Sequence, residues 1–119
     1  MYWGYHLMLD CSGCDQSLMK DRDNVYNFTK TLVGRIDMTA HGEPIIEFLC
    51  PGDPDKEGFS LLQLITTSNI AGHFIDHHGH IYLDVFSCRQ FDTKIVIDTV
   101  KEFFSAKKIR VNFLTRNAD

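Results

Sequence analysis

The chain has 119 residues, 44% of them hydrophobic, and a formal net charge of -4 from 16 acidic and 12 basic residues. This length fits one domain, residues 1–119, and excludes a second hydrophobic core. The acidic balance argues against nucleic acid as a partner, and no segment has the apolar length of a membrane span or the pattern of a signal peptide. We therefore expect one cytoplasmic domain whose four cysteines are thiols.

The first half of the chain predicts strands around one amphipathic helix. In chain order, we expect a strand at 6–11, a helix at 18–33, strands at 36–40 and 45–50, and a loop at 51–58. The helix is indicated by apolar residues that recur every three to four positions, and Gly34 marks its end.

The second half predicts more strands and one further helix. In chain order, these are strands at 59–67, 69–75 and 81–87, a helix at 93–105 and a strand at 109–114. Asp92 is a candidate cap of this helix, and a turn rich in histidine surrounds Gly79. We therefore expect an α+β fold, a two-layer sandwich of a mostly antiparallel sheet with two helices on one face. A second copy would cover the other face if that face is apolar, giving a homodimer with four layers, αββα.

The stretch from Ser60 to Cys88 holds the candidate chemistry. Ser68 follows Ser60 by eight residues, His73 lies five residues further on, and Cys88 lies twenty residues past Ser68. This spacing resembles the core of bacterial S-adenosylmethionine decarboxylase. The segments Gly4-Tyr5-His6-Leu7 and Gly13-Cys14-Asp15 are similar to the family's first strand and turn.

The resemblance implies a pyruvoyl-dependent carboxy-lyase of polyamine and spermidine biosynthesis, made as a zymogen. Ser68 would attack the carbonyl of Thr67, which splits the chain into a β chain, 1–67, and an α chain, 68–119. The cofactor would be a covalent pyruvoyl group, a bound form of pyruvate, which replaces Ser68 and forms a Schiff base with the substrate amine. Cys88 matches the proton donor of the decarboxylation. Ser60 and His73 match residues that assist cleavage.

Other positions depart from the family pattern. The family has Glu-Ser-His at the cleavage point, whereas this chain has Thr67-Ser68-Asn69, and His77 stands where the family has a carboxylate that contacts the nucleoside. Phe48 and Phe59 are the candidates for the aromatic ring that stacks on adenine. S-adenosylmethionine is the leading substrate, a basic amino acid such as ornithine or arginine is the alternative, and an uncleaved relative with a binding or regulatory role is the third hypothesis.

Strand geometry predicts how the candidate residues divide between two chains. Ser60 and Ser68 are expected on one strand, where eight residues span about 26 Å. The two serines therefore cannot meet within one chain. We expect Ser68 and Cys88 of one subunit to work with Ser60 and His73 of the other, at two equivalent sites.

Zinc is a rival interpretation. Cys11 and Cys14 form a CxxC pair, and histidines that could complete a site are found at 73, 77, 78 and 80. However, these histidines crowd one turn without a recurrent zinc spacing, and a second CxxC is absent. We therefore predict no metal site.

Overall fold

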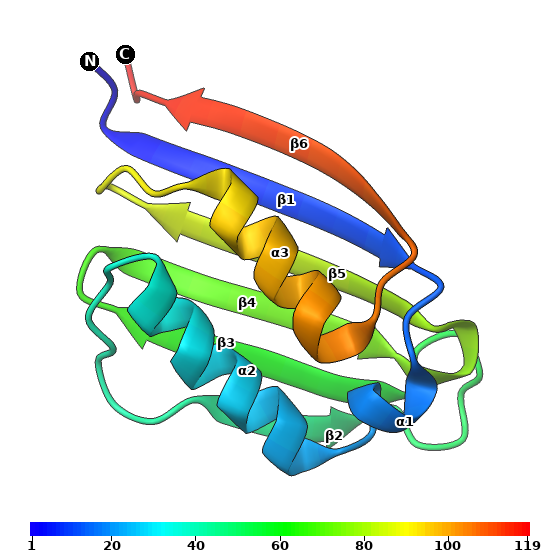
Figure 1. Cartoon of the computed structure of the whole chain (residues 1–119). Coiled ribbons are helices and arrows are strands. Elements are labelled where there is room, and N and C mark those ends of the chain that lie inside the picture. Colours follow the sequence, from blue (N-terminus) through cyan, green and yellow to red (C-terminus); the bar gives the residue numbers. More distant parts are fainter.

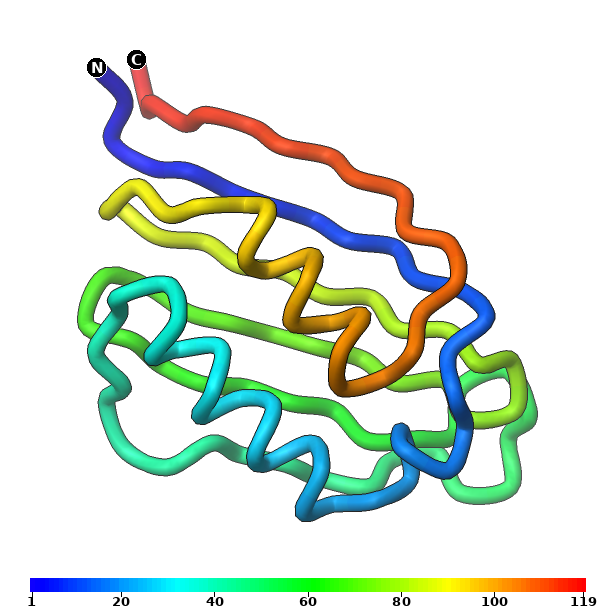
Figure 2. Tube along the Cα trace, in the orientation of Figure 1, coloured from blue at the N-terminus to red at the C-terminus, as the bar shows by residue number.

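The computed structural model describes residues 1–119 and has a six-stranded sheet with helices on one face (Figure 1). The strands are β1 (Gly4–Ser12), β2 (Ile45–Leu49), β3 (Gly58–Ile65), β4 (Ser68–Ile75), β5 (His80–Ser87) and β6 (Lys108–Arg116). Their order is β2-β3-β4-β5-β1-β6, and every neighbouring pair is antiparallel. Because β1 pairs with β6, the two termini lie side by side (Figure 2). The predicted α+β sandwich is confirmed.

Three α-helices form where two were predicted. They are α1 (Gln16–Met19), α2 (Arg22–Arg35) and α3 (Thr93–Phe104). The single helix expected at 18–33 is divided because the Asp21 carboxylate accepts hydrogen bonds from the backbone N–H groups of Asp23 and Asn24, which starts a new helix. Asp92 caps α3 as expected. No helix is long and apolar enough to cross a membrane.

Two strand predictions were wrong. The segment 36–40 forms no strand, because Ile36 caps the end of α2 and Ala40 makes only a single bridge with Ile65. The strand predicted at 59–67 ends at Ile65, and the two-residue turn Thr66-Thr67 leads into β4. Ser60 and Ser68 therefore lie on adjacent strands of a hairpin. The turn was missed because it contains none of the Gly, Asn or Asp residues that favour such turns.

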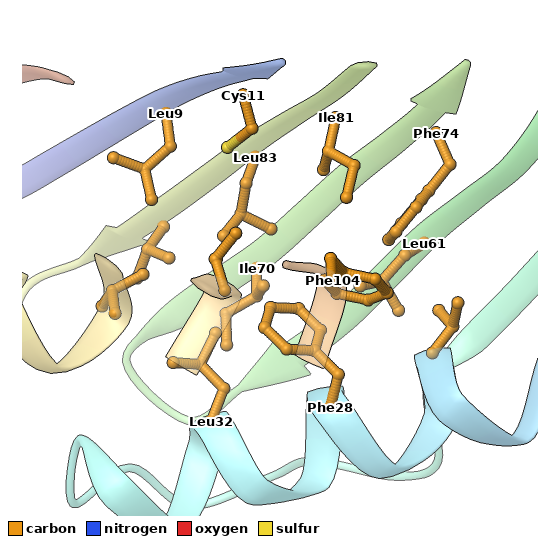
Figure 3. Close-up of a cluster of buried hydrophobic side chains, with 14 of the residues drawn as sticks. Leu9, Cys11, Phe28, Leu32, Leu61, Ile70, Phe74, Ile81, Leu83 and Phe104 are labelled. Carbon is orange, nitrogen blue, oxygen red and sulfur yellow. The ribbon is translucent and has the colours of Figure 1, made fainter. Parts of the chain in front are cut away.

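The hydrophobic core lies between the sheet and the helices (Figure 3). Side chains alternate across a strand, so every second residue of each central strand points toward the helices. Among these are Leu7, Leu9, Leu61, Ile70, Phe74 and Leu83, each at most 2% exposed. Phe28 of α2 and Phe104 of α3 meet edge to face above them, with ring centroids 4.9 Å apart.

The opposite side of the sheet has no covering layer. We call it the open face; its residues include Glu47, Leu49, Ser60, Leu62, Leu64, Asn69, Ala71, His73, Tyr82, Asp84, Phe86, His6 and Met8. It contains large apolar side chains in solvent, with Leu64 48% and Leu62 39% exposed. It also contains Ser60, His73, His6 and Asp84, whereas Ser68 and Ser87 share the strand parity of the buried Ile70 and Val85.

Candidate active site

Ser68 begins β4 directly after the hairpin turn. Its backbone pairs with Ile65 on one side and with Ser87 on the other. The φ angle of Ser68 is 154°, in a region that L side chains rarely adopt. Such conformations cost about 1–3 kcal/mol and persist only where the surrounding structure imposes them. The Thr67–Ser68 peptide bond therefore lies at a tight turn beside a strained residue.

Thr67 is held in place through both its carbonyl and its hydroxyl group. The Cys88 backbone N–H donates to the Thr67 carbonyl oxygen at 2.9 Å. The buried Ser87 hydroxyl donates to Thr67 Oγ1 at 2.8 Å, and Thr67 Oγ1 donates to the Met38 sulfur at 3.3 Å. A fixed N–H donor on a carbonyl oxygen can stabilise negative charge that develops there. Sequence reasoning missed Ser87 and Met38, whose roles depend on contacts between distant segments.

Cys88 follows β5 and is exposed. Strand alternation puts it on the same side as Asp84 and Phe86, which is the open face. Its backbone bond to Thr67 keeps it next to the start of β4. The structure thus places the backbones of Ser68 and Cys88 close together in one chain. We call Thr67, Ser68, Ser87 and Cys88 the Ser68 half-site.

Ser60 and His73 form a second group, which we call the Ser60 half-site. They are directly opposed on β3 and β4, and Ser60 Oγ lies 3.2 Å from His73 Nδ1. Gly58 permits the close approach of the strands here, because a Cβ atom at this position would lie 1.8 Å from the Phe74 carbonyl oxygen. His73 is five residues from Ser68 along β4, which corresponds to about 16 Å. The two half-sites are therefore separated within one chain. The prediction that Ser60 and Ser68 share one strand was wrong, because they lie on β3 and β4.

The three candidate substrate-binding residues lie outside both half-sites. Phe48 and Phe59 are opposed on β2 and β3, with rings 6.0 Å apart, on the side of the sheet that carries the helices. Phe59 packs against the core, whereas Phe48 is 48% exposed. His77 Nε2 lies 2.7 Å from a Glu57 carboxylate oxygen. The Gly52 N–H and His77 together lower the pKa of Glu57.

The residues considered for zinc do not converge. Cys11 and Cys14 are buried, and burial raises their thiol pKa values to about 12 and about 11. Both thiols are therefore protonated at neutral pH. His78 is engaged with Asp55 at 2.9 Å. No group of three or more His, Cys, Asp or Glu residues is arranged to hold a metal ion.

The α+β sandwich defines the fold class of the protein, and this fold has a solved counterpart. The structure of the adenosylmethionine decarboxylase from Aquifex aeolicus has the same fold, with a TM-score of 0.81 and 19% sequence identity over 99% of this chain and 93% of that chain. Residues 5–117 match the family model described as S-adenosylmethionine decarboxylase. The chain belongs to this family, and the resemblance seen in the sequence is confirmed.

Relatives of known name agree with this assignment. The S-adenosylmethionine decarboxylase proenzyme of Clostridium botulinum strain Langeland is 26% identical over 116 residues, which is 97% of this chain and 95% of that protein. The proenzyme of the same name from Pyrococcus abyssi is 23% identical over 117 residues, which is 98% of this chain and 80% of that protein. The chain is a divergent member of the family.

Proposed function

We propose that this chain is a proenzyme that cleaves itself between Thr67 and Ser68 and then decarboxylates S-adenosylmethionine for polyamine synthesis. Family membership supports the reaction class. The observation that carries the proposal is the Thr67 carbonyl, which accepts a hydrogen bond from the Cys88 N–H at 2.9 Å beside a Ser68 with a φ of 154°. The fixed N–H donor would stabilise the negative charge on this oxygen if the neighbouring hydroxyl group attacks the carbonyl.

Cleavage would begin when Ser68 Oγ bonds to the Thr67 carbonyl carbon. The hydroxyl proton is lost, the C–N bond breaks, and the Ser68 nitrogen takes up a proton, so the peptide becomes an ester. Loss of the Ser68 α proton then breaks the C–O bond and leaves a carboxylate on Thr67. Water replaces ammonia on the new end and produces a pyruvoyl group. The Cys88 N–H stabilises the oxyanion of the first step, and the Ser87 hydroxyl fixes Thr67.

The residues at the Ser68 half-site suit this group. A pyruvoyl group would supply a carbonyl that condenses with the substrate amine and takes up electrons as carbon dioxide leaves. Cys88 would then donate its thiol proton to the carbon that has lost the carboxylate. Cys88 directly follows β5 and is exposed, so a substrate can reach its thiol from solvent.

The Ser60 half-site would act from a second subunit. It lies about 16 Å from Ser68 in its own chain, too far for contact. The open face offers an apolar surface for pairing, with Ile45 54%, Leu49 46%, Leu62 39% and Leu64 48% exposed. Two chains that pack these faces together would form the αββα homodimer. The Ser60–His73 pair of one chain could then meet the Ser68 half-site of its partner and assist cleavage.

A second candidate keeps the chemistry and changes the substrate. His77 replaces the carboxylate expected for nucleoside binding, and its Nε2 is already engaged with Glu57 at 2.7 Å. The absence of this carboxylate favours a basic amino acid, ornithine or arginine, as the alternative substrate.

Intact mass of the denatured protein tests the cleavage. We expect two fragments, 1–67 and 68–119, the second with a blocked pyruvoyl end. Carbon dioxide release from S-adenosylmethionine, ornithine, arginine and lysine then ranks the substrates. A chain that stays intact under all conditions contradicts the proposal and favours an uncleaved binding or regulatory relative.

A further inference from the structure

His6 and Asp84 form a hydrogen-bonded pair on the open face, outside both half-sites. His6 Nε2 lies 3.3 Å from Asp84 Oδ1, and the side chains are 22% and 39% exposed. Within the chain, Nδ1 of His6 makes no hydrogen bond. A carboxylate that accepts from Nε2–H selects the tautomer in which Nδ1 carries the lone pair. The pair thus leaves a lone pair on His6 Nδ1.

The strand register places this pair close to the Ser68 half-site. His6 of β1 is opposite Phe86 of β5, and Phe86 is opposite Asn69 of β4, the residue after Ser68. Two strand spacings separate His6 from Asn69, which is about 10 Å. The His6 ring contacts the Phe86 ring in a tilted arrangement, with centroids 5.4 Å apart. His73 is about 16 Å from Ser68 along β4 and is already bonded to Ser60.

A cavity of about 310 Å³ adjoins Phe86, the residue opposite His6. Its lining residues are Trp3, Phe86, Arg116, Asn117 and Ala118, and neither His6 nor Asp84 is among them. The guanidinium group of Arg116 lies over the Phe86 ring at 4.7 Å. The charged groups on this side of the sheet near His6 are Asp84 on β5, Arg116 on β6 and, four residues further along β1, Asp10. Asp84 makes an ion pair with His6 and with no other cationic group.

The proposed chemistry needs a base for the substrate amine. An amino-acid amine is almost wholly protonated at neutral pH, and its nitrogen has no lone pair with which to attack a carbonyl. We propose that His6, oriented by Asp84, accepts the proton that the substrate ammonium group loses before the amine bonds to the carbonyl formed at Ser68. The proton moves from the substrate nitrogen to His6 Nδ1, and Asp84 stabilises the resulting imidazolium. His6 would be a catalytic residue and Asp84 a positioning residue. This inference rests on the proposed function.

Kinetics of three variants test the proposal: His6→Gln, Asp84→Asn and, as a matched control, His80→Gln, which removes another histidine from the open face. We expect all three to cleave themselves, read by intact mass. His6→Gln should lose about 10²- to 10⁴-fold in kcat/KM at pH 7, Asp84→Asn somewhat less, and the control little. The activity of His6→Gln should recover toward that of the wild type as rising pH supplies free amine. A His6→Gln variant with wild-type activity and an unchanged pH profile would overturn the proposal.

A second readout does not depend on activity. In the uncleaved Ser68→Ala chain, ¹⁵N NMR should find the Nε2–H tautomer at His6, and Asp84→Asn in that background should remove this preference. An Nδ1–H tautomer, or the same spectrum in both chains, contradicts the pairing. Failure of the wild type to cleave would refute the proposed function by mass alone, so the two failures are distinguishable.

Discussion

The two faces of the sheet use alternate residues of the same strands for different purposes. On the face under the helices, Leu61 is 2% and Ile70 0% exposed, whereas on the open face Leu62 is 39% and Leu64 48% exposed. The covered face is closed by the chain's own helices, and its packing determines the fold. The open face carries Ser60, His73, Asp84 and His6, so these four candidate side chains lie on the side that a single chain does not cover.

The largest effect is expected from Ser68→Ala, which removes the attacking oxygen. Self-cleavage and decarboxylation should both be lost completely. The circular dichroism spectrum and the thermal midpoint should stay close to those of the wild-type chain before cleavage. Intact mass is the measurement. Ser12→Ala, a serine at the far end of β1, is the control and should cleave normally. A cleaved Ser68→Ala chain would contradict the assignment of the nucleophile.

Cys88→Ala should separate cleavage from turnover. The backbone N–H that holds the Thr67 carbonyl remains in this variant, so we expect cleavage to continue. Loss of the general acid should reduce kcat by about 10²- to 10⁴-fold. Mass spectrometry and carbon dioxide release on the same sample give both readouts. Unchanged turnover would exclude the thiol as the proton donor.

Two adjacent leucines compare the faces directly. Leu61→Ala opens a cavity in the covered core and should lower the free energy of unfolding by about 2–5 kcal/mol. Leu62→Ala should cost the isolated chain less than about 1 kcal/mol, because the side chain is already partly in solvent. If the open face is a subunit interface, Leu62→Ala should instead raise the dimer dissociation constant. Chemical denaturation and sedimentation measure the two effects, and equal losses of stability would contradict the distinction.

The smallest effect is expected at Asp76, which follows β4 and is 3% exposed with Oδ1 unpaired. Burial raises the pKa of this carboxyl group. Its protonated form is favoured in the folded state, so its contribution to stability is present at low pH and is lost as pH rises through the raised pKa. Asp76→Asn should remove this loss and raise the free energy of unfolding by about 1 kcal/mol at pH 7. Unfolding measured between pH 3 and 7 checks the sign, and a less stable variant at pH 7 would contradict it.

The fold was largely predictable because local patterns dominate it. Apolar periodicity and caps such as Asp92 located most elements, and alternation in the strands separated the covered face from the open face. The divided helix was missed because the cap at Asp21 sits inside a continuous apolar pattern. The hairpin was missed because Thr66 and Thr67 have high strand propensity, and tertiary pairing overrides that preference.

The site was only partly predictable. Sequence spacing predicted Ser60, Ser68, His73 and Cys88 as site residues, and the antiparallel register explains why they divide into two groups. Sequence gave no signal for the contact of Ser87 with Thr67, which joins residues twenty positions apart. The pairing of His6 with Asp84 spans 78 positions and depends on β1 lying next to β5. Such contacts follow from topology, which local patterns do not contain.

Co-expression of two inactive chains tests most directly whether one site is built from two subunits. Ser60→Ala and Ser68→Ala chains, with different tags, would be co-purified as mixed dimers and analysed by intact mass. In a mixed dimer, the intact Ser68 half-site of the first chain meets the intact Ser60 half-site of the second. We predict that the Ser60→Ala chain is then cleaved faster than in its own homodimer. If its cleavage is slow in both dimers, the two half-sites act within one chain and the account is contradicted.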